Sequence, residues 1–155
     1  MPASLDQLKK LSIFNDLTDI QLQLLGEVGD LISLGAGQTL IPFDAVGENL
    51  YGILEGRVQI QVKTKQDKMS PLRYLYEGEI VGEQSLFDQA KTAAAVVADC
   101  QLNCIKWNGS TLKKLLQANA ELGRDVYYRL CRASMNRLNL SNRIFREAIS
   151  EGELC

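Results

Sequence analysis

The sequence contains no histidine among its 155 residues. Ser-His-Asp and Cys-His nucleophile chemistry, histidine-ligated zinc and histidine proton shuttles are therefore excluded together. No apolar run approaches the roughly 20 residues that a membrane-spanning helix needs, and the polar start at residues 1–10 is unlike a signal peptide. These absences predict a cytoplasmic protein without a membrane segment, and they leave few ways to build an enzyme.

An excess of charge of one sign is also lacking. The 17 lysines and arginines against 19 acidic residues give a net charge of −2, and the pI is near 5.2. Such a balance creates no overall field that would attract nucleic acid or an anionic membrane. We therefore expect no direct DNA binding and no membrane partner, and any anion site must be built locally.

Cysteine is scarce, with four residues, no Cys-X-X-Cys pair and no spacing typical of a secreted disulfide framework. Reduced thiols are expected. Cys100 and Cys104 lie on a strand-like stretch at a spacing that can put both on one face. Without histidine or a second pair nearby, they are interpreted as buried or half-buried thiols, and no metal site is predicted.

The hydrophobic pattern divides one expected domain, residues 1–155, into three parts. Helically spaced leucines in residues 1–30 predict two short helices, the second capped by Thr18. Residues 31–107 change to short β-rich runs cut by glycine, which is typical of an antiparallel sandwich or barrel. The expected strands are 38–41, 50–54, 57–62, 72–76, 94–98 and 102–105. The polar stretch between the third and fourth, residues 63–71, is predicted to be a hairpin loop.

Helical periodicity returns in residues 110–149, where Ser110 and Asn119 are the expected caps of a short helix and of a long last helix over about 121–148. One side of the long helix is apolar over a wide stripe. The arginines on its opposite side are expected to be solvated: Arg124, Arg129, Arg132, Arg143 and Arg146. Among the aromatic residues, Trp107 is predicted to anchor the core, and Tyr51 and Tyr76 are interpreted as core or strand residues.

Four motifs follow one another through the β region. They are Ala36-Gly37-Gln38, Asn49-Leu50-Tyr51-Gly52-Ile53-Leu54-Glu55-Gly56-Arg57-Val58, Gly78-Glu79-Ile80-Val81-Gly82-Glu83 and Thr92-Ala93-Ala94-Ala95-Val96-Val97-Ala98. With the flanking helices, they resemble the cyclic nucleotide-binding domain of catabolite activator regulators, protein kinase A regulatory subunits and cyclic-nucleotide-gated channels. The resemblance runs from residue 14 to about 145. It implies a mainly β fold, an eight-stranded jelly-roll-like β-roll (double-stranded β-helix) with short N-terminal helices and a long C-terminal helix.

The resemblance places a phosphate-binding cassette at residues 82–93. In such a cassette, backbone N–H groups at a helix N-terminus hold a phosphate without any net positive charge. By resemblance, Glu83 accepts a hydrogen bond from the ribose 2'-hydroxyl, Gly82 lets the backbone approach the sugar, and the amides of Gln84 and Ser85 lie near the phosphate. The implied ligand is cAMP or another cyclic nucleotide, and no cofactor is implied.

The cassette departs from the family pattern at its phosphate-clamping arginine. Thr92 stands in the arginine's place, between Lys91 and Ala93. Making Lys91 the substitute would require an inserted residue in a buried strand, so we favour Thr92. Exchanging a bidentate charged contact for a hydroxyl costs about 1.5–3 kcal/mol, which is roughly ten- to a hundredfold in affinity. Weak binding is expected.

In the family the last helix pairs with its twin, so the resemblance implies a homodimer. Ser134, Arg137 and Ser141 interrupt the apolar stripe in one narrow sector, and family members use polar residues of this helix to reach the purine. Our hypothesis is that Arg137 supplies the charge that Thr92 lacks, either to a ligand phosphate or to an acid such as Glu83. The alternatives, which are more ordinary, are an ion pair between subunits and a side chain that extends to water.

Two functions follow from these observations. The first is a cyclic-nucleotide sensor that signals through its C-terminal helix to an unidentified effector protein. The second is a degenerate β-roll that no longer binds nucleotide and serves as a dimerisation or protein-interaction module. An enzyme ranks third, because the sequence has no glycine-rich nucleotide loop of the P-loop or Rossmann type, and no catalytic residue is predicted.

Overall fold

Two four-stranded antiparallel sheets make up the centre of the computed structural model, which describes residues 1–87 and 90–152. The first sheet has the order β1-β8-β3-β6 and the second the order β2-β7-β4-β5. The first is built from Gly29–Leu34 (β1), Leu102–Asn108 (β8), Asn49–Glu55 (β3) and Ile80–Val81 (β6). The second is built from Thr39–Ile41 (β2), Ala95–Ala98 (β7), Val58–Lys63 (β4) and Met69–Leu75 (β5). The predicted mainly β fold with flanking helices is confirmed.

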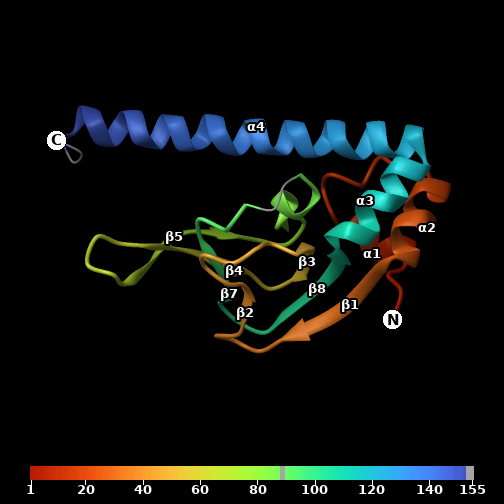
Figure 1. Cartoon of the computed structure of the whole chain (residues 1–155), viewed down its shortest axis with the longest axis horizontal. Helices are drawn as coiled ribbons and strands as arrows, with labels where there is room; N and C mark the ends of the chain where they lie inside the picture. The colour runs from red at the N-terminus through yellow and green to blue at the C-terminus, as the bar shows by residue number, and fades with distance from the viewer. Residues whose placement is uncertain (88–89, 153–155) are drawn as a thin grey trace.

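Helices lie at one end of the sheets and along their length (Figure 1). They are Leu5–Lys9 (α1), Asp19–Glu27 (α2), the short 3₁₀ helix Glu83–Leu86 (η1), Gly109–Ala118 (α3) and Ala120–Ser150 (α4). The α1, α2 and α3 helices gather around the start of α4, and α4 then runs past the sheets. No helix among the described residues is both long and apolar enough to cross a membrane.

One of the three predicted helix caps is present. The Thr18 side chain accepts a hydrogen bond from the amide of Gln21, whose side chain in turn accepts from the amide of Thr18. The prediction for Ser110 is wrong, because β8 runs on to Asn108, which caps α3 by accepting from the amide of Thr111 at 3.0 Å. Asn119 precedes α4 as expected, but its side chain donates backwards to a carbonyl in α3 and does not cap α4.

All six expected strands form, with shifted ends. The largest shifts are at the end of β8, which runs on to Asn108, and at the start of β5, which takes in Met69, Ser70 and Pro71 from the predicted loop. These residues pair only with β4 at an edge of the second sheet, and the register shifts opposite Pro71. An edge strand tolerates proline and polar residues, so the hydrophobic pattern does not reveal it. The β1 and β6 strands were not among the expected six.

The core of the first sheet is centred on Trp107. Its indole nitrogen donates to the carbonyl of Leu25 at 2.9 Å, and its ring meets Phe14 edge-on with centroids 5.8 Å apart. Trp107 is fully buried, which confirms the prediction, and Tyr51 is buried in the core of the second sheet. The prediction for Tyr76 is wrong: it follows β5 in a turn and is 53% exposed.

The α4 helix is buried only near its start, at Leu122, Gly123, Val126 and Leu130. The rest of the predicted apolar stripe is not covered within this chain. Large apolar side chains are exposed along the distal half of α4: Met135, Leu138, Leu140, Ile144, Phe145 and Ile149. At 100° per residue, four of them project to one side of the helix and are called the distal apolar face below: Met135, Leu138, Phe145 and Ile149. The helix therefore extends beyond what the sheets alone can bury.

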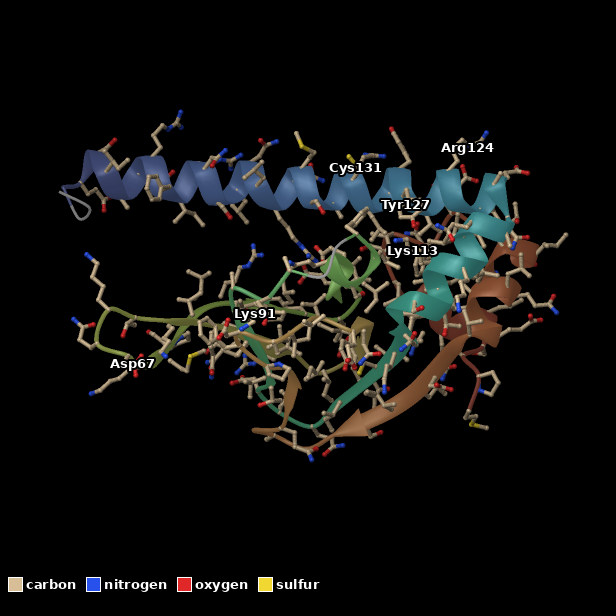
Figure 2. The ribbon with its side chains drawn as sticks, viewed as in Figure 1. Asp67, Lys91, Lys113, Arg124, Tyr127 and Cys131 are labelled. Carbon is tan, nitrogen blue, oxygen red and sulfur yellow. The ribbon has the colours of Figure 1, made fainter. Side chains whose placement is uncertain are left out.

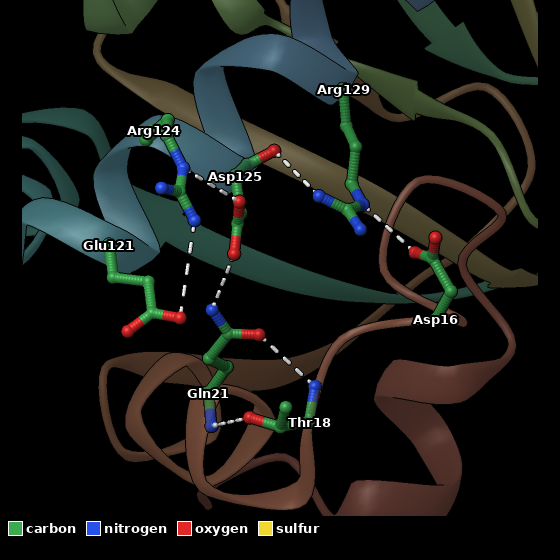
Figure 3. A network of polar contacts seen from close by, with 7 residues as sticks. All are labelled: Asp16, Thr18, Gln21, Glu121, Arg124, Asp125 and Arg129. Carbon is green, nitrogen blue, oxygen red and sulfur yellow. Dashed lines mark hydrogen bonds and ion pairs between the residues drawn. The ribbon is translucent and has the colours of Figure 1, made fainter.

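Polar contacts join the N-terminal segment to the start of α4 (Figure 3). Arg129 Nε donates to Asp16 Oδ1 at 2.8 Å, and Gln21 Nε2 donates to Asp125 Oδ2 at 2.8 Å. The hydrogen bond from Arg129 lowers the pKa of Asp16, and the hydrogen bond from Gln21 lowers the pKa of Asp125. Arg129 thus bridges two segments, whereas the sequence pattern predicted a solvated side chain.

Candidate functional site

A cavity of about 500 Å³ lies between the second sheet, the turn at residues 82–87 and the middle of α4. Its floor is a row of side chains that crosses all four strands of the sheet. The row consists of Ile41 on β2, Val96 on β7, Ile60 on β4 and Arg73 on β5, each paired with its neighbour in the strand register. All four line the cavity, which gives it an apolar floor with a single cation at one edge.

Gly82 sets the backbone at the mouth of the turn. Its φ is +91°, and a Cβ placed there would lie 2.3 Å from the carbonyl oxygen of Asn49. Both the left-handed conformation and the close approach of β3 require glycine. Gly82 thereby turns the chain from β6 into η1, so that Glu83 follows it at the cavity.

Glu83 and Arg137 meet inside the chain. Arg137 Nη1 donates to Glu83 Oε1 at 2.6 Å, while Nη2 donates to the carbonyl of Ile80. The two side chains are 20% and 23% exposed, so the pair is partly shielded from water. The sequence left open whether Arg137 contacts a ligand phosphate, an acid such as Glu83, another subunit or water. Within this chain, the contact observed is the one with Glu83.

Two serines of α4 were grouped with Arg137 in the sequence. Ser134 lies one turn before it and also lines the cavity. Ser141 lies one turn after it, is exposed, and does not line the cavity. Within this chain, the structure therefore brings together two of the three polar residues that interrupt the stripe.

The two residues considered in the arginine's place are both engaged elsewhere. The Thr92 hydroxyl donates to the carbonyl of Pro42 at 2.5 Å and accepts from the amide of Ala45 at 3.2 Å. Lys91 does not line the cavity, and its ammonium lies 3.8 Å from Asp44 at the surface. Thr92 lines the cavity, but its hydroxyl proton is already donated to the carbonyl of Pro42 in the loop before β3.

The backbone donors of the cassette divide into two groups. The amide of Ser85 donates to the carbonyl of Gly82 at 3.1 Å inside η1, so this amide is not available as the resemblance implied. Gln84 lines the cavity, and its side chain reaches the carbonyl of Ala90. No carbonyl among the described residues accepts from the amides of Ala93 and Ala94, which both line the cavity. The amides of Ala93 and Ala94 are thus main-chain donors at the cavity without a partner among the described residues.

The cassette also touches α4 through an aromatic contact. The rings of Phe87 and Tyr127 lie 5.8 Å apart and are tilted by 52°. Figure 2 labels Tyr127 on the stretch of α4 that lies over the turn. With the ion pair of Arg137, this contact gives α4 a second attachment to the cassette.

Sequence reasoning missed Arg73. Its Nε is buried and has no hydrogen-bond partner in residues 1–87 and 90–152. The signal was present in the strand pattern, because Arg73 shares the inward face of β5 with buried Leu75. A cation at an inward position of a strand is unusual enough to merit attention.

The match to known proteins agrees with this geometry. The family model for the cyclic nucleotide-binding domain matches residues 31–119, more than half of the chain. The chain belongs to this family. The family is one of regulatory binding domains, and the expected assignment to it is confirmed.

Individual relatives agree. Over 107 residues the chain is 29% identical to the cAMP-activated global transcriptional regulator CRP of Salmonella typhimurium, covering 67% of this chain and 48% of the regulator. It is 25% identical over 121 residues to a cAMP-dependent protein kinase regulatory subunit of Aspergillus fumigatus, covering 78% of this chain and 29% of that protein. The chain thus spans about half or less of the length of these curated relatives.

A solved structure shares the fold. A cyclic nucleotide-binding domain from Methylobacillus flagellatus superposes with a TM-score of 0.80 at 23% identity, covering 93% of this chain and 82% of that one. The regulatory subunit of a cAMP-independent protein kinase A from Trypanosoma brucei has a TM-score of 0.72 at 23% identity, covering 86% of this chain and 46% of that one. These likenesses concern the arrangement of strands and helices.

Proposed function

We propose that the chain acts as a single cytoplasmic regulatory domain that binds a cyclic nucleotide in the cavity and signals through α4, without catalysing a reaction. The observation that carries the proposal is the ion pair between Glu83 and Arg137, which joins a residue of the cassette to a residue of α4 in the lining of the cavity. A ligand in this cavity contacts both elements at once.

The proposed contacts follow from the hydrogen-bond donors and acceptors at the cavity that are not already used within the chain. The amides of Ala93 and Ala94 hold the phosphate, since they face the cavity without backbone partners among the described residues. Glu83 keeps acceptor capacity beyond the bond from Arg137 and takes the ribose hydroxyl. Arg137 orients that carboxylate and offsets its charge. The Lys91 and Ser141 side chains have no part in this arrangement.

Signalling is proposed to work by a shift between two positions of α4. A ligand changes such an equilibrium only through contacts that differ between the two states. The contacts of Arg137 and of Tyr127 with the cassette are of this kind, because both change if the turn at residues 82–87 moves. The output then passes along α4 to an effector protein.

The distal apolar face is proposed to pack against the same helix of a second copy, giving a homodimer. Its four large apolar side chains are exposed in the single chain. Sedimentation of the full chain tests this proposal: a dimer is expected, and charged substitutions at Leu138 and Phe145 should yield monomers that remain folded.

A second candidate function is a β-roll that binds no nucleotide and serves as an interaction module. It is favoured by Thr92, whose hydroxyl is engaged by Pro42 and Ala45 where a phosphate-clamping arginine is expected. In this case the cavity binds no ligand, and the function of the chain is to dimerise and to bind partner proteins.

Calorimetric titration of the full chain with cAMP and cGMP, with 5'-AMP as a non-cyclic control, separates the two functions. Saturable binding of a cyclic nucleotide with a raised thermal midpoint is expected, because a ligand that binds only the folded state stabilises it. No binding of either cyclic nucleotide at millimolar concentration, by a chain that is dimeric, would support the second candidate.

A further inference from the structure

A second cavity, of about 340 Å³, lies between the N-terminal segment at residues 12–16 and the stretch of α4 at residues 128–136. The described residues that line it are all different from those of the cavity beside the cassette. Most of its lining side chains are polar or charged. Its volume lies within the range of small-molecule sites, and such a lining suits a charged ligand better than an apolar one.

The described lining of this second cavity carries more positive than negative charge. It contains Arg129 and Arg132 but a single acid, Asp16. The Asp16 carboxylate is already paired, because Arg129 Nε donates to it at 2.8 Å, as Figure 3 shows. Arg132 forms no ion pair with the described part of the chain, and its guanidinium lies 5.9 Å from the centre of the Tyr128 ring. One positive charge of the lining is therefore uncompensated.

Hydrogen-bond donors that the chain does not use line the second cavity from both walls. Arg129 donates through Nε and Nη1, which leaves Nη2 for a ligand. Asn136 on α4 and Asn15 on the N-terminal segment add side-chain amides that have no partner within residues 1–87 and 90–152. The guanidinium of Arg132 adds further donors and no acceptor. A lining rich in free donors, with its one carboxylate already paired, indicates an anion as the ligand.

The arrangement of the donors favours a tetrahedral anion over a planar one. A carboxylate accepts hydrogen bonds near one plane, whereas a phosphate group directs its oxygens to several sides. The donors come from two walls, with Arg132 and Asn136 on α4 and Asn15 on the N-terminal segment. We propose that the second cavity binds the phosphate group of a small molecule, with Arg132 as its principal contact. This inference goes beyond the proposed function and does not depend on cyclic nucleotide binding.

The second cavity stays open in the proposed homodimer. At 100° per residue, Arg129 and Asn136 project about 160–180° away from Leu138 on the distal apolar face. A phosphate bound there contacts both the N-terminal segment and α4, next to the bond between Asp16 and Arg129. It therefore favours the position of α4 observed here, because a ligand shifts an equilibrium towards the state that it binds better. The site is thus a second point of control on α4.

The test is calorimetric titration of the full chain with inorganic phosphate, pyrophosphate and acetate at constant ionic strength. Saturable binding of both phosphate probes is expected. Acetate should bind about tenfold more weakly than phosphate or worse, since it leaves at least one charge-assisted hydrogen bond unmade. Constant ionic strength removes the general screening of surface charges from the comparison.

Variants locate the binding in the second cavity. Arg132→Gln removes the charge at an exposed position and should weaken pyrophosphate about tenfold or more, as the loss of one charge-assisted hydrogen bond implies. Arg143→Gln is the matched control, because Arg143 is exposed on the same side of α4 but does not line the cavity, and it should bind like the parent. Asn136→Asp is the second variant: it places a negative charge in the lining and should abolish phosphate binding.

Three outcomes would overturn the inference. They are no saturable binding of phosphate or pyrophosphate by the folded parent, acetate binding as tightly as phosphate, and pyrophosphate binding that Arg132→Gln weakens no more than Arg143→Gln does. The last result would place the bound anion elsewhere on the chain. Failure of cyclic nucleotides to bind would remove the proposed function and leave this site unaffected, so the two proposals fail separately.

Discussion

Arg137 donates to Glu83 across 2.6 Å, and this contact joins the middle of α4 to the first residue of the cassette helix. The two residues are far apart in the sequence, yet their charges are complementary and both line the same cavity. The attachment of α4 to the cassette therefore depends on one charge-assisted hydrogen bond, supported by the ring contact of Phe87 with Tyr127.

A double-mutant cycle tests this coupling. Arg137→Ala leaves Glu83 partly buried without its cation, so it should destabilise the fold by about 1–2 kcal/mol. Glu83→Ala with Arg137→Ala should cost less than the sum of the single changes by about 1 kcal/mol. Urea denaturation measures the free energy of unfolding of the two single variants, Arg137→Ala and Glu83→Ala, and of the double variant. Arg143→Ala, at an exposed position of the same helix, is the control. Additive costs would show that the two residues are not coupled.

Gly82→Ala should be strongly destabilising, because alanine there meets both a positive φ and the carbonyl of Asn49 at 2.3 Å. Gly37→Ala is the matched control: its φ is +86°, but nothing lies within 4 Å of the added methyl group. We expect Gly37→Ala to lower the free energy of unfolding by about 1 kcal/mol, from backbone strain alone, and Gly82→Ala to lower it by more. Equal losses in chemical denaturation would mean that the contact with Asn49 relaxes freely.

Acid should loosen the attachment of the N-terminal segment to α4. The pKa values of Asp16 and Asp125 are lowered by hydrogen bonds from Arg129 and Gln21, so both carboxylates bind protons less readily when folded. Their contribution is present above the ordinary aspartate pKa of 3.8 and is lost as the pH falls through the lower folded values. Thermal midpoints measured from pH 6 to pH 2 should fall less steeply in Asp16→Asn. An unchanged slope would contradict this.

The cysteines should differ sharply in reactivity. Burial raises the pKa of Cys104 to about 12, so its reactive thiolate is scarce at neutral pH, while Cys131 on α4 is exposed. Cys155 lies outside the described residues, so the measurement uses Cys155→Ser. Mass spectrometry after brief iodoacetamide treatment should find Cys131 modified and Cys104 unmodified until the chain is denatured. Rapid alkylation of native Cys104 would contradict its burial.

Local patterns allowed much of the fold to be predicted. The Thr18 capping box and the alternation of Val58 and Ile60 each follow from residues close in the chain, and both are present. The errors arise where distant segments decide the outcome. Arg129 seemed solvated because Asp16, its partner, lies more than a hundred residues away. Asn108 caps α3 because the pairing of β8 with β1 and β3 extends the strand.

The candidate site divides in the same way. Gly82 and Glu83 were found from a motif, since the turn is encoded locally. The engagement of Thr92 with Pro42 and Ala45 was not, because it depends on how the loop before β3 folds back. Arg73 was missed because β5 pairs at a sheet edge, where polar residues are common and a single inward cation is not conspicuous.

The length of α4 has a mechanical consequence. Beyond Arg137 the helix continues to Ser150, a rise of about 20 Å. A rigid lever of that length converts a tilt of about 10° at the Arg137 pivot into a sideways displacement of about 3.5 Å at the tip. That displacement is close to the thickness of an aromatic ring. A small rotation of α4 beside Glu83 is therefore sufficient to change which side chains meet at the far end of the helix.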